Sequence, residues 1–412
     1  MSAPNGLCAV DALVTVKADK PVITVGGPDA DIPAFDSRAI QIAIDAIALR
    51  GAGGTVRLGA GTFDITGPVR LTDDLDLIGA GEETILRKCD GFRTNYVIDA
   101  DYGMIKVVVA DASGFKVGMG MQLFDDRHNG GYGVSTAVIT SIDGDTLYFD
   151  KGVIWDYRAD ANGTVSNACS IISGVEVENC RIADLVVEGN GSSNDMINGC
   201  VGGGVYLSRT RNITVEGVTV QNFNGDSFSW QITENITVRN CTAKNGFLVG
   251  FHPGTGSDTS IIENCTSHHN GTDGIFLCWR VQNSILRNNR LFANKRHGLS
   301  IGHKDSDNLF EGNAIYENAR HGVYFRDENE QNAGHRNTFR SNTIENNGSP
   351  DFDAYGFYID GETNDILIEN NTIRSTGKGN QTGAVFVGPK ASRVVTKNNT
   401  VSGHRNVVES GE

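Results

Sequence analysis

The chain has little proline, an excess of acidic over basic residues, and no long apolar run. Its 412 residues include 8 Pro and 51 Gly, and the glycines show no period of three, which excludes a collagen-like triple helix. No apolar run approaches the roughly 20 residues of a membrane-spanning helix, so we expect no integral membrane protein. Lys and Arg number 35 against 50 Asp and Glu, and a net charge of −15 argues against a general nucleic-acid-binding protein.

The eight cysteines contain no Cys-x-x-Cys pair, which disfavours a zinc ribbon or a thioredoxin-type site. We expect them to be buried free thiols, because most stand in apolar or repeat-like contexts. The first 19 residues lack a basic segment followed by an apolar one, so no signal peptide is recognised in them and the cellular location stays open.

From about residue 204 the sequence repeats with a period near 24. A Gly-apolar-x-apolar motif starts at Gly204, Gly246, Gly274, Gly298, Gly322, Gly356 and Gly383. An apolar-x-x-Asn/Cys motif ends at Cys241, Cys265, Asn289, Asn313, Asn342, Asn371 and Asn398. Short alternating strands with Asn and Gly turns at a fixed period predict a parallel β-helix, in which stacked Asn side chains form a ladder. Cys241 and Cys265 are then inward neighbours, about 4.8 Å apart.

The region before the repeat predicts a cap and an insertion. Asp36 and Ser37 offer a helix N-cap, and Ala39, Ile40, Ala43, Ile44 and Ile47 follow at helical spacing, so a short helix is expected to cover the open end of the solenoid. The period breaks between about 103 and 165. We therefore predict a cap and first coils over 1–102, an inserted β subdomain or long loops over 103–170, and coils that carry the functional groove over 171–412.

Two stretches resemble a known family. The segment DSRAIQIAIDAIALRGAGGTVRLGAGTF resembles the N-terminal cap and first coil of the pectate-lyase-like superfamily, which implies an all-β fold, a right-handed single-stranded parallel β-helix. Residues 250–302 are similar to the catalytic module of mannuronan C-5-epimerases. Asp273 matches that family's catalytic Asp, and Arg296 and His297 match its Arg-His pair. Its catalytic Tyr and His are missing, because Val249 and Gly254 stand at those positions, and His252 replaces an Asp.

The residues of the same segment independently predict a polysaccharide groove. Seven of the nine His lie between 252 and 335, and eight basic against four acidic residues lie between Trp279 and Arg326, so an anionic ligand fits this window. Counting six positions past the repeat glycines gives a column expected along one sheet edge, namely His252, Arg280, Lys304, Glu328 and Glu362. We expect His252 to be exposed in its Gly-rich turn and Trp279 to stack on a sugar ring.

A lyase or epimerase that acts on a uronate needs a cation to neutralise the carboxylate, a base to remove the C-5 proton, and an acid. Arg280, Arg296, Lys304 and Arg326 are candidate cations, and His252 or His303 is the candidate base. The predicted catalytic residues are His252, Asp273, Arg280, His303, Lys304, Arg326 and Asp327. The predicted substrate-binding residues are Asp226, Trp279, Arg296, His297, Tyr324 and Asp360.

Two other functions stay open. A glycoside hydrolase needs two carboxylates, which Asp226, Asp273, Asp327, Glu328 and Asp360 can supply. The third hypothesis is that the protein is a solenoid that binds carbohydrate without catalysis. No motif for an organic cofactor is present, whereas Asp305, Asp307, Asp327, Glu328 and Glu330 offer the oxygen ligands that Ca²⁺ prefers. A monomer and a homo-oligomer both fit, including a trimer through the solenoid flanks.

Overall fold

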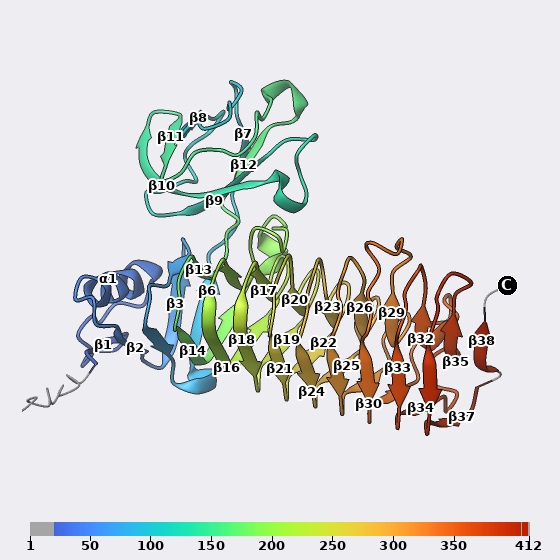
Figure 1. Ribbon diagram of the computed structural model, residues 1–412. Helices are drawn as coiled ribbons and strands as arrows, with labels where there is room; N and C mark the ends of the chain where they lie inside the picture. Colours follow the sequence, from blue (N-terminus) through green and yellow to red (C-terminus); the bar gives the residue numbers. More distant parts are fainter. Residues whose placement is uncertain (1–19, 405, 411–412) are drawn as a thin grey trace, which may run out of the picture.

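A computed structural model describes residues 20–404 and 406–410 of the chain. Its long axis is a stack of coils that begins at a capped end and continues to the C-terminal strands, with a second unit standing to one side (Figure 1). The first 19 residues, in which no signal peptide is recognised, and Cys8 among them, lie outside the described residues.

The helix α1 (Ser37–Ala48) covers the first coil as predicted. Asp36 caps it, since its side chain accepts a hydrogen bond of 2.7 Å from the backbone N–H of Ala39. Its apolar face, including Ile40 and Ile44, is buried in the same core as the first strands. The open end of the solenoid is thereby hidden from solvent. Among the described residues, no helix has both the length and the apolar character needed to cross a membrane.

The coils stack as parallel strands on several faces. One face is an eleven-stranded parallel sheet. In spatial order its strands are β4 (Val69–Arg70), β13 (Ile172–Val175), β15 (Val205–Ser208), β17 (Phe228–Gln231), β20 (Phe251–Pro253), β23 (Ile275–Phe276), β26 (Leu299–Ile301), β29 (Val323–Phe325), β32 (Ala354–Ile359), β35 (Gln381–Val387) and β38 (Asn406–Ser410).

The remaining coil strands join in a sheet of 21 strands that turns a corner within each coil. One of its stacks comprises β1 (Val22–Val25), β2 (Gly54–Leu58), β5 (Leu75–Ile78), β14 (Arg181–Glu188), β16 (Arg211–Gln221), β18 (Glu234–Arg239), β21 (Ile261–Glu263), β24 (Ile285–Arg287), β27 (Leu309–Glu311), β30 (Thr338–Arg340), β33 (Leu367–Glu369) and β36 (Val395–Lys397). The neighbouring stack comprises β3 (Gly61–Ile65), β6 (Thr84–Lys88), β19 (Thr242–Lys244), β22 (Thr266–His268), β25 (Arg290–Phe292), β28 (Ala314–Tyr316), β31 (Thr343–Glu345), β34 (Thr372–Arg374) and β37 (Thr400–Ser402).

The register of these strands builds the core from the repeat. Ile262 pairs with Leu286, and Leu286 pairs with Phe310, so each apolar residue lies over its counterpart 24 positions away. Phe310 in turn stacks on Phe339 with ring centroids 4.5 Å apart. Because an inward position stays inward in every coil, the core lengthens along the axis and is not limited by the thickness of one layer.

A buried Asn ladder runs through the turns, as the repeat predicts. The side chain of Asn289 bonds to Asn313, and the ladder continues through Asn342 and Asn371. Its next member is Asn399, whose Oδ1 accepts from Asn371, so the predicted Asn398 is wrong by one position. Asn398 instead takes a left-handed turn conformation (φ 54°). Cys241 and Cys265 occupy the same column as buried free thiols, as expected.

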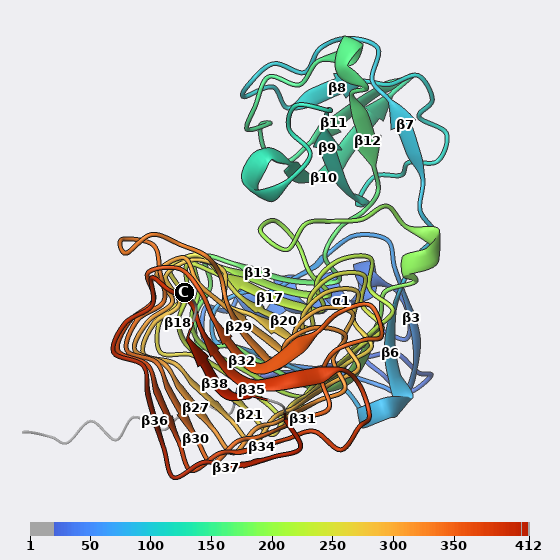
Figure 2. The same cartoon turned by 90° about the vertical axis from the view of Figure 1, so that its right-hand side faces the viewer.

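A six-stranded antiparallel sheet forms the lateral unit, which we call the inserted subdomain (residues 93–166). Its strands are β7 (Arg93–Asn95), β12 (Thr164–Ser166), β9 (Gly120–Phe124), β10 (Ser135–Asp143), β11 (Thr146–Phe149) and β8 (Lys106–Val108). It has its own apolar cluster, and its first strand begins before residue 103, where the period of the sequence breaks. Figures 1 and 2 show it on the side of the coils where β13 and β17 lie.

Candidate functional site

The outward face of the eleven-stranded sheet, together with the turns at both ends of its strands, carries every predicted site residue. Along the middle of this face runs one column of side chains, which we call the central column. Its members follow the strand register and are Tyr206, Ser229, His252, Phe276, Ser300, Tyr324, Tyr358 and Phe386. Side chains that lie far apart in the sequence therefore share one surface.

Two predictions about His252 are wrong. Phe251 pairs with Ile275, so the glycine equivalent to Gly274 is Gly250, and Gly246 lies four residues earlier in the same connection between β19 and β20. His252 consequently aligns with Phe276 in the central column and not with Arg280 at the strand end. It lies on a strand and is 5% exposed, where an exposed turn was expected. The count was wrong because Gly246 fits the Gly-apolar-x-apolar motif, whereas Pro253 interrupts that motif after Gly250.

His252 forms a short pair with Asp226 from the preceding coil. Its Nδ1 lies 2.5 Å from Oδ2 of Asp226, and Oδ1 of Asp226 accepts from the backbone N–H of Val249 at 2.9 Å. Burial opposes the charge on His252, but the Asp226 carboxylate outweighs it and raises the pKa to about 10. The ring therefore carries both protons at neutral pH. Its Nε2 is buried with no hydrogen-bond partner among the described residues.

Two cysteines adjoin this pair, and neither was predicted as a site residue. The thiol of Cys278 interacts with His252 and with the thiol of Cys200, which lies in the loop between β14 and β15. Cys200 and Cys278 are free and half-buried. Their spacing in the sequence carries no motif, so only the fold brings them together.

Asp273, Arg296 and His297 form a second group at the N-terminal ends of the strands. Asp273 is 1% exposed, and its Oδ1 accepts from the backbone N–H of His297 at 3.0 Å. Oδ2 has no hydrogen bond within the described part of the chain and lies 3.8 Å from Nη1 of Arg296. Burial raises the pKa of Asp273, whereas Arg296 opposes that rise. Burial also lowers the pKa of His297 well below its usual range, so this ring is neutral, and it stacks on Tyr324 at 4.4 Å.

Trp279, His303 and Glu328 form a third group at the opposite ends of the strands. The Nδ1 of His303 lies 3.1 Å from the carbonyl oxygen of Cys278, and its Nε2 lies 2.5 Å from Oε1 of Glu328. Each ring nitrogen of His303 therefore faces an oxygen that can accept a hydrogen bond. Trp279 packs against His303 with ring centroids 4.9 Å apart and is 36% exposed.

The predicted cations differ in their availability. Arg326 bonds to Ser300 Oγ at 2.9 Å and to Asp305 at 3.1 Å, and it lies over the ring of Phe276 at 4.5 Å. Its charge is therefore held within the protein. Arg280 and Lys304 have no carboxylate within ion-pair distance among residues 20–404.

Two predicted carboxylates stand apart from these groups. Asp327 is exposed and lies 3.9 Å from Lys390, and Oδ1 of Asp360 accepts from the backbone N–H of Gly361. The basic window is also divided, because Arg287 and Arg290 lie on β24 and β25, away from the eleven-stranded sheet.

The carboxylates considered for Ca²⁺ do not form a cage. Asp305 pairs with Arg326, Asp307 with Arg336, and Glu328 with His303. Within the described residues, no three His, Cys, Asp or Glu side chains gather in a way that could hold a metal ion. The residues present therefore do not fit a Ca²⁺ site at this place.

Comparison with known families identifies the class of protein. The family described as right handed beta helix region matches residues 143–303 and 203–373, together more than half of the chain, and the protein belongs to this family. The resemblance to the right-handed parallel β-helix superfamily that the sequence carries is thereby confirmed. No curated protein matches the chain.

Solved structures support the same fold. The A-module of the Azotobacter vinelandii mannuronan C-5 epimerase AlgE6 has a TM-score of 0.58 and 19% identity, over 90% of this chain and 91% of that one. The A-module of AlgE4 from the same organism has a TM-score of 0.55 and 20% identity, over 91% and 94%. A structure titled glycoside hydrolase has a TM-score of 0.53 and 11% identity, over 93% and 96%. At these identities the likeness establishes the fold.

Proposed function

We propose that the protein is a carbohydrate-active enzyme whose glycan lies along the outward face of the eleven-stranded sheet. The preferred reaction is elimination or C-5 epimerisation of a uronate. The observation that carries this proposal is the placement of an acid and a carboxylate on adjacent coils. His252 is protonated at Nε2, Asp273 has a free Oδ2, and both atoms are buried without a hydrogen-bond partner among the described residues. Buried polar atoms left unpaired are costly and mark sites that a ligand completes.

The chemistry needs three roles, and this face can supply each of them. Arg280 and Lys304, which have no acidic partner among the described residues, are available to neutralise the substrate carboxylate, and this neutralisation acidifies the C-5 proton. Asp273 would accept that proton through Oδ2. His252 would donate the Nε2 proton to the leaving oxygen in a lyase, or to the opposite face of C-5 in an epimerase. The sequence suggested His252 as a candidate base, whereas here it is proposed to act as the acid.

Aromatic rings in the central column favour a sugar ligand. Tyr324, Tyr358 and Phe386 lie on successive coils and are half-buried, and the last two stack at 4.4 Å. Successive coils are about 4.8 Å apart, so the rings form a continuous apolar strip on which sugar faces can stack. Two of the similar structures are named as mannuronan C-5 epimerases, which supports the same substrate class.

Glycoside hydrolysis is the second candidate. Asp226 and Asp273 occupy equivalent positions two coils apart, which separates their backbones by about 9.6 Å. Carboxyl groups of inverting hydrolases stand roughly 6.5–9.5 Å apart. One similar structure is titled glycoside hydrolase. Against this role, Asp226 is already bonded to His252.

A panel of uronate polymers separates the candidates. Elimination yields an unsaturated sugar that absorbs near ~232 nm, hydrolysis yields reducing ends without that absorbance, and epimerisation changes the proton NMR spectrum of an intact chain. Binding of a polymer without any of these changes would contradict the proposal that the protein is an enzyme, and it would favour a carbohydrate-binding solenoid without catalysis. No binding and no turnover on any acidic or neutral glycan would contradict the whole proposal.

Matched variants test the assigned residues. Asp273→Asn and His252→Gln should each lower kcat at least ~100-fold while the far-ultraviolet circular dichroism spectrum stays unchanged. Asp307→Asn is the control, because Asp307 is exposed and pairs with Arg336 at 2.7 Å away from the groups described above. Full activity of Asp273→Asn would contradict the assignment of Asp273 as the base that removes the C-5 proton.

A further inference from the structure

A cleft of about 680 Å³ lies between the inserted subdomain and the first coils. Its volume is within the roughly 300–1,000 Å³ of small-ligand pockets. The coils contribute Arg70, Tyr206 and Arg209 to the lining, and the subdomain contributes Tyr132, Lys151 and Ile154. Asp45 and Asp150 also line the cleft. Arg70 pairs with Asp150 at 3.0 Å and Arg209 pairs with Glu176 at 2.7 Å, so Lys151 is the one basic side chain of the lining without an ion pair among the described residues.

Tyr132 is an exposed aromatic side chain that several contacts hold in place. It is 45% exposed, and its hydroxyl donates to Oε1 of Gln231 on β17 at 3.2 Å. The indole N–H of Trp155 donates to the backbone carbonyl of Tyr132 at 3.2 Å. Trp155 is itself 47% exposed and stacks on His128 with ring centroids 5.0 Å apart and an interplanar angle of 14°. Fixing an exposed ring before a ligand arrives lowers the entropic cost of binding.

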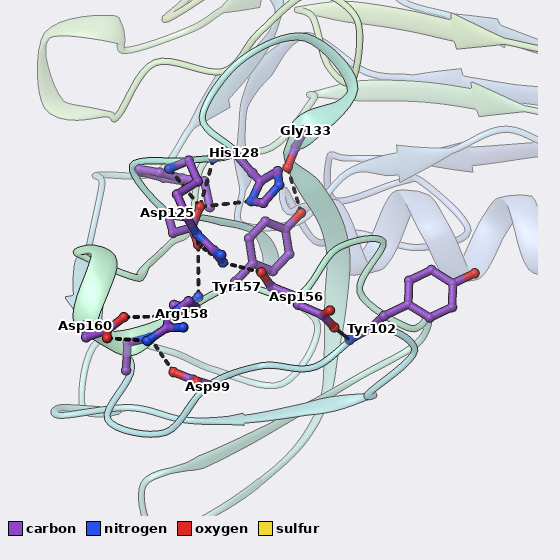
Figure 3. A network of polar contacts seen from close by, with 12 residues as sticks. Asp99, Tyr102, Asp125, His128, Gly133, Asp156, Tyr157, Arg158 and Asp160 are labelled. Carbon is purple, nitrogen blue, oxygen red and sulfur yellow. Dashed lines mark hydrogen bonds and ion pairs between the residues drawn. The ribbon is translucent and has the colours of Figure 1, made fainter.

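The support beneath these rings is a buried carboxylate. Asp125 is fully buried and accepts from His128 Nδ1 at 3.1 Å, from Arg127 at 2.8 Å and from the backbone N–H of Arg158 at 2.9 Å. Figure 3 shows the ring of His128 and the backbone N–H of Arg158 directed at Asp125, while the Arg158 side chain turns to Asp160 and Tyr157 is bonded to Gly133. Burial opposes the charge on Asp125, but these hydrogen bonds lower its pKa to about 2. The ionised carboxylate of Asp125 therefore holds the residues around the loop that carries Tyr132 in place.

The cleft is continuous with the outward face of the eleven-stranded sheet. Gln231, which Tyr132 contacts, also accepts from the backbone N–H of Thr255 at 2.9 Å in the turn that follows His252. Cys200 lines the cleft and interacts with Cys278, which adjoins His252. A chain bound over His252 could thus extend under the subdomain without leaving the protein surface.

We propose that this cleft is a binding subsite for an acidic oligosaccharide chain, in which Tyr132 stacks on a sugar ring and Lys151 attracts its carboxylates. The proposal deepens the function proposed above and rests on it for the position of the reacting sugar. It assigns the inserted subdomain a role as the second wall of the glycan site. The enzyme should then bind long chains more tightly than chains that cover only the reacting position.

Calorimetric titration with size-fractionated oligomannuronate, oligoguluronate and oligogalacturonate, from two to ten residues, tests the subsite in the full chain. Wild-type affinity should rise with chain length. Tyr132→Ala and Lys151→Ala should each weaken binding of the longest oligosaccharide about tenfold and leave binding of the shortest oligosaccharide unchanged. Tyr132→Phe should bind as the wild type does, because it keeps the ring and loses only the bond to Gln231.

Tyr102→Ala is the matched control, since Tyr102 is 73% exposed on the same subdomain and does not line the cleft. Equal affinity of Tyr132→Ala, Lys151→Ala and the wild type for the longest chain overturns the subsite, as does the absence of binding to every acidic probe. Length-dependent binding that Tyr132→Ala abolishes, without turnover of any polymer, supports the subsite while it refutes the proposed reaction. A urea unfolding curve for each variant shows whether it is folded, and Lys151→Ala tests the subsite independently if Tyr132→Ala is not folded.

Discussion

Nδ1 of His252 lies 2.5 Å from Oδ2 of Asp226, although 26 positions separate the two residues in the sequence. The contact exists because each coil of the β-helix returns the chain to the same face one strand spacing further along the axis. It turns a histidine of ordinary appearance into a buried cation with a free Nε2.

The His252–Asp226 pair should make stability depend on pH. The pKa of His252 is about 10 in the folded protein and roughly 6.5 when unfolded, so the folded state holds the proton more tightly. This contribution is complete below about pH 6.5 and is lost as the pH rises toward 10. The difference in free energy of unfolding between wild type and His252→Gln should therefore shrink over that window. Urea unfolding at pH 6, 8 and 10 measures it, and a constant difference would contradict the raised pKa.

Asn313→Ala should destabilise the coils by about 2–4 kcal/mol. The Asn313 side chain donates to Leu286 at 2.8 Å and to Asn342 at 2.9 Å, and it accepts from Asn289, so its loss leaves several buried groups unpaired. Asn398→Gly is the control, because Asn398 is exposed and its φ of 54° suits glycine. Chemical unfolding should separate the two variants; similar losses would mean that the ladder adds little.

Trp279→Ala should weaken glycan binding about tenfold, and Trp279→Phe should retain most of the affinity. The ring is 36% exposed and lies beside His303, so one face is supported while another is open to a sugar. Affinity for the polymer that the enzyme binds best, measured by gel retardation, is the readout. If alanine and phenylalanine bind alike, Trp279 serves only to pack His303.

The cysteines should differ sharply in reactivity. Contact with the Cys278 thiol lowers the pKa of Cys200, which lines the cleft, whereas burial raises the pKa of Cys241 well above its usual range. Iodoacetamide at pH 7.5 should therefore label Cys200 long before Cys241 or Cys265, as peptide mass spectrometry will show. Labelling of Cys241 at the rate of Cys200 in the folded protein would contradict the burial of that column.

The fold was predictable because each coil of a solenoid contacts only the coils next to it. The 24-residue spacing, the capping helix and the Asn column each follow from neighbours within one or two coils, and the structure confirms them, with Asn399 in place of Asn398. The arrangement of the candidate site was harder to predict from the sequence. His252 was assigned to the wrong column because the motif starts at Gly246 in this coil, and a count from Gly250 would have placed it opposite Phe276. Cys200, Gln231 and Tyr132 left no signal, since no period links them to the coils that they contact.

The sequence by itself determined the architecture, the direction of growth of the core and the stretch of coils that carries the candidate chemistry. Repeated Gly, Asn and apolar positions specify how one coil lies on the next, and that rule needs no long-range information. Only the tertiary structure decided the protonation of His252, the isolation of Asp327, and the cleft under the inserted subdomain. Burial and charge depend on what surrounds a side chain in three dimensions. Those surroundings come from other coils and from an insertion outside the repeat.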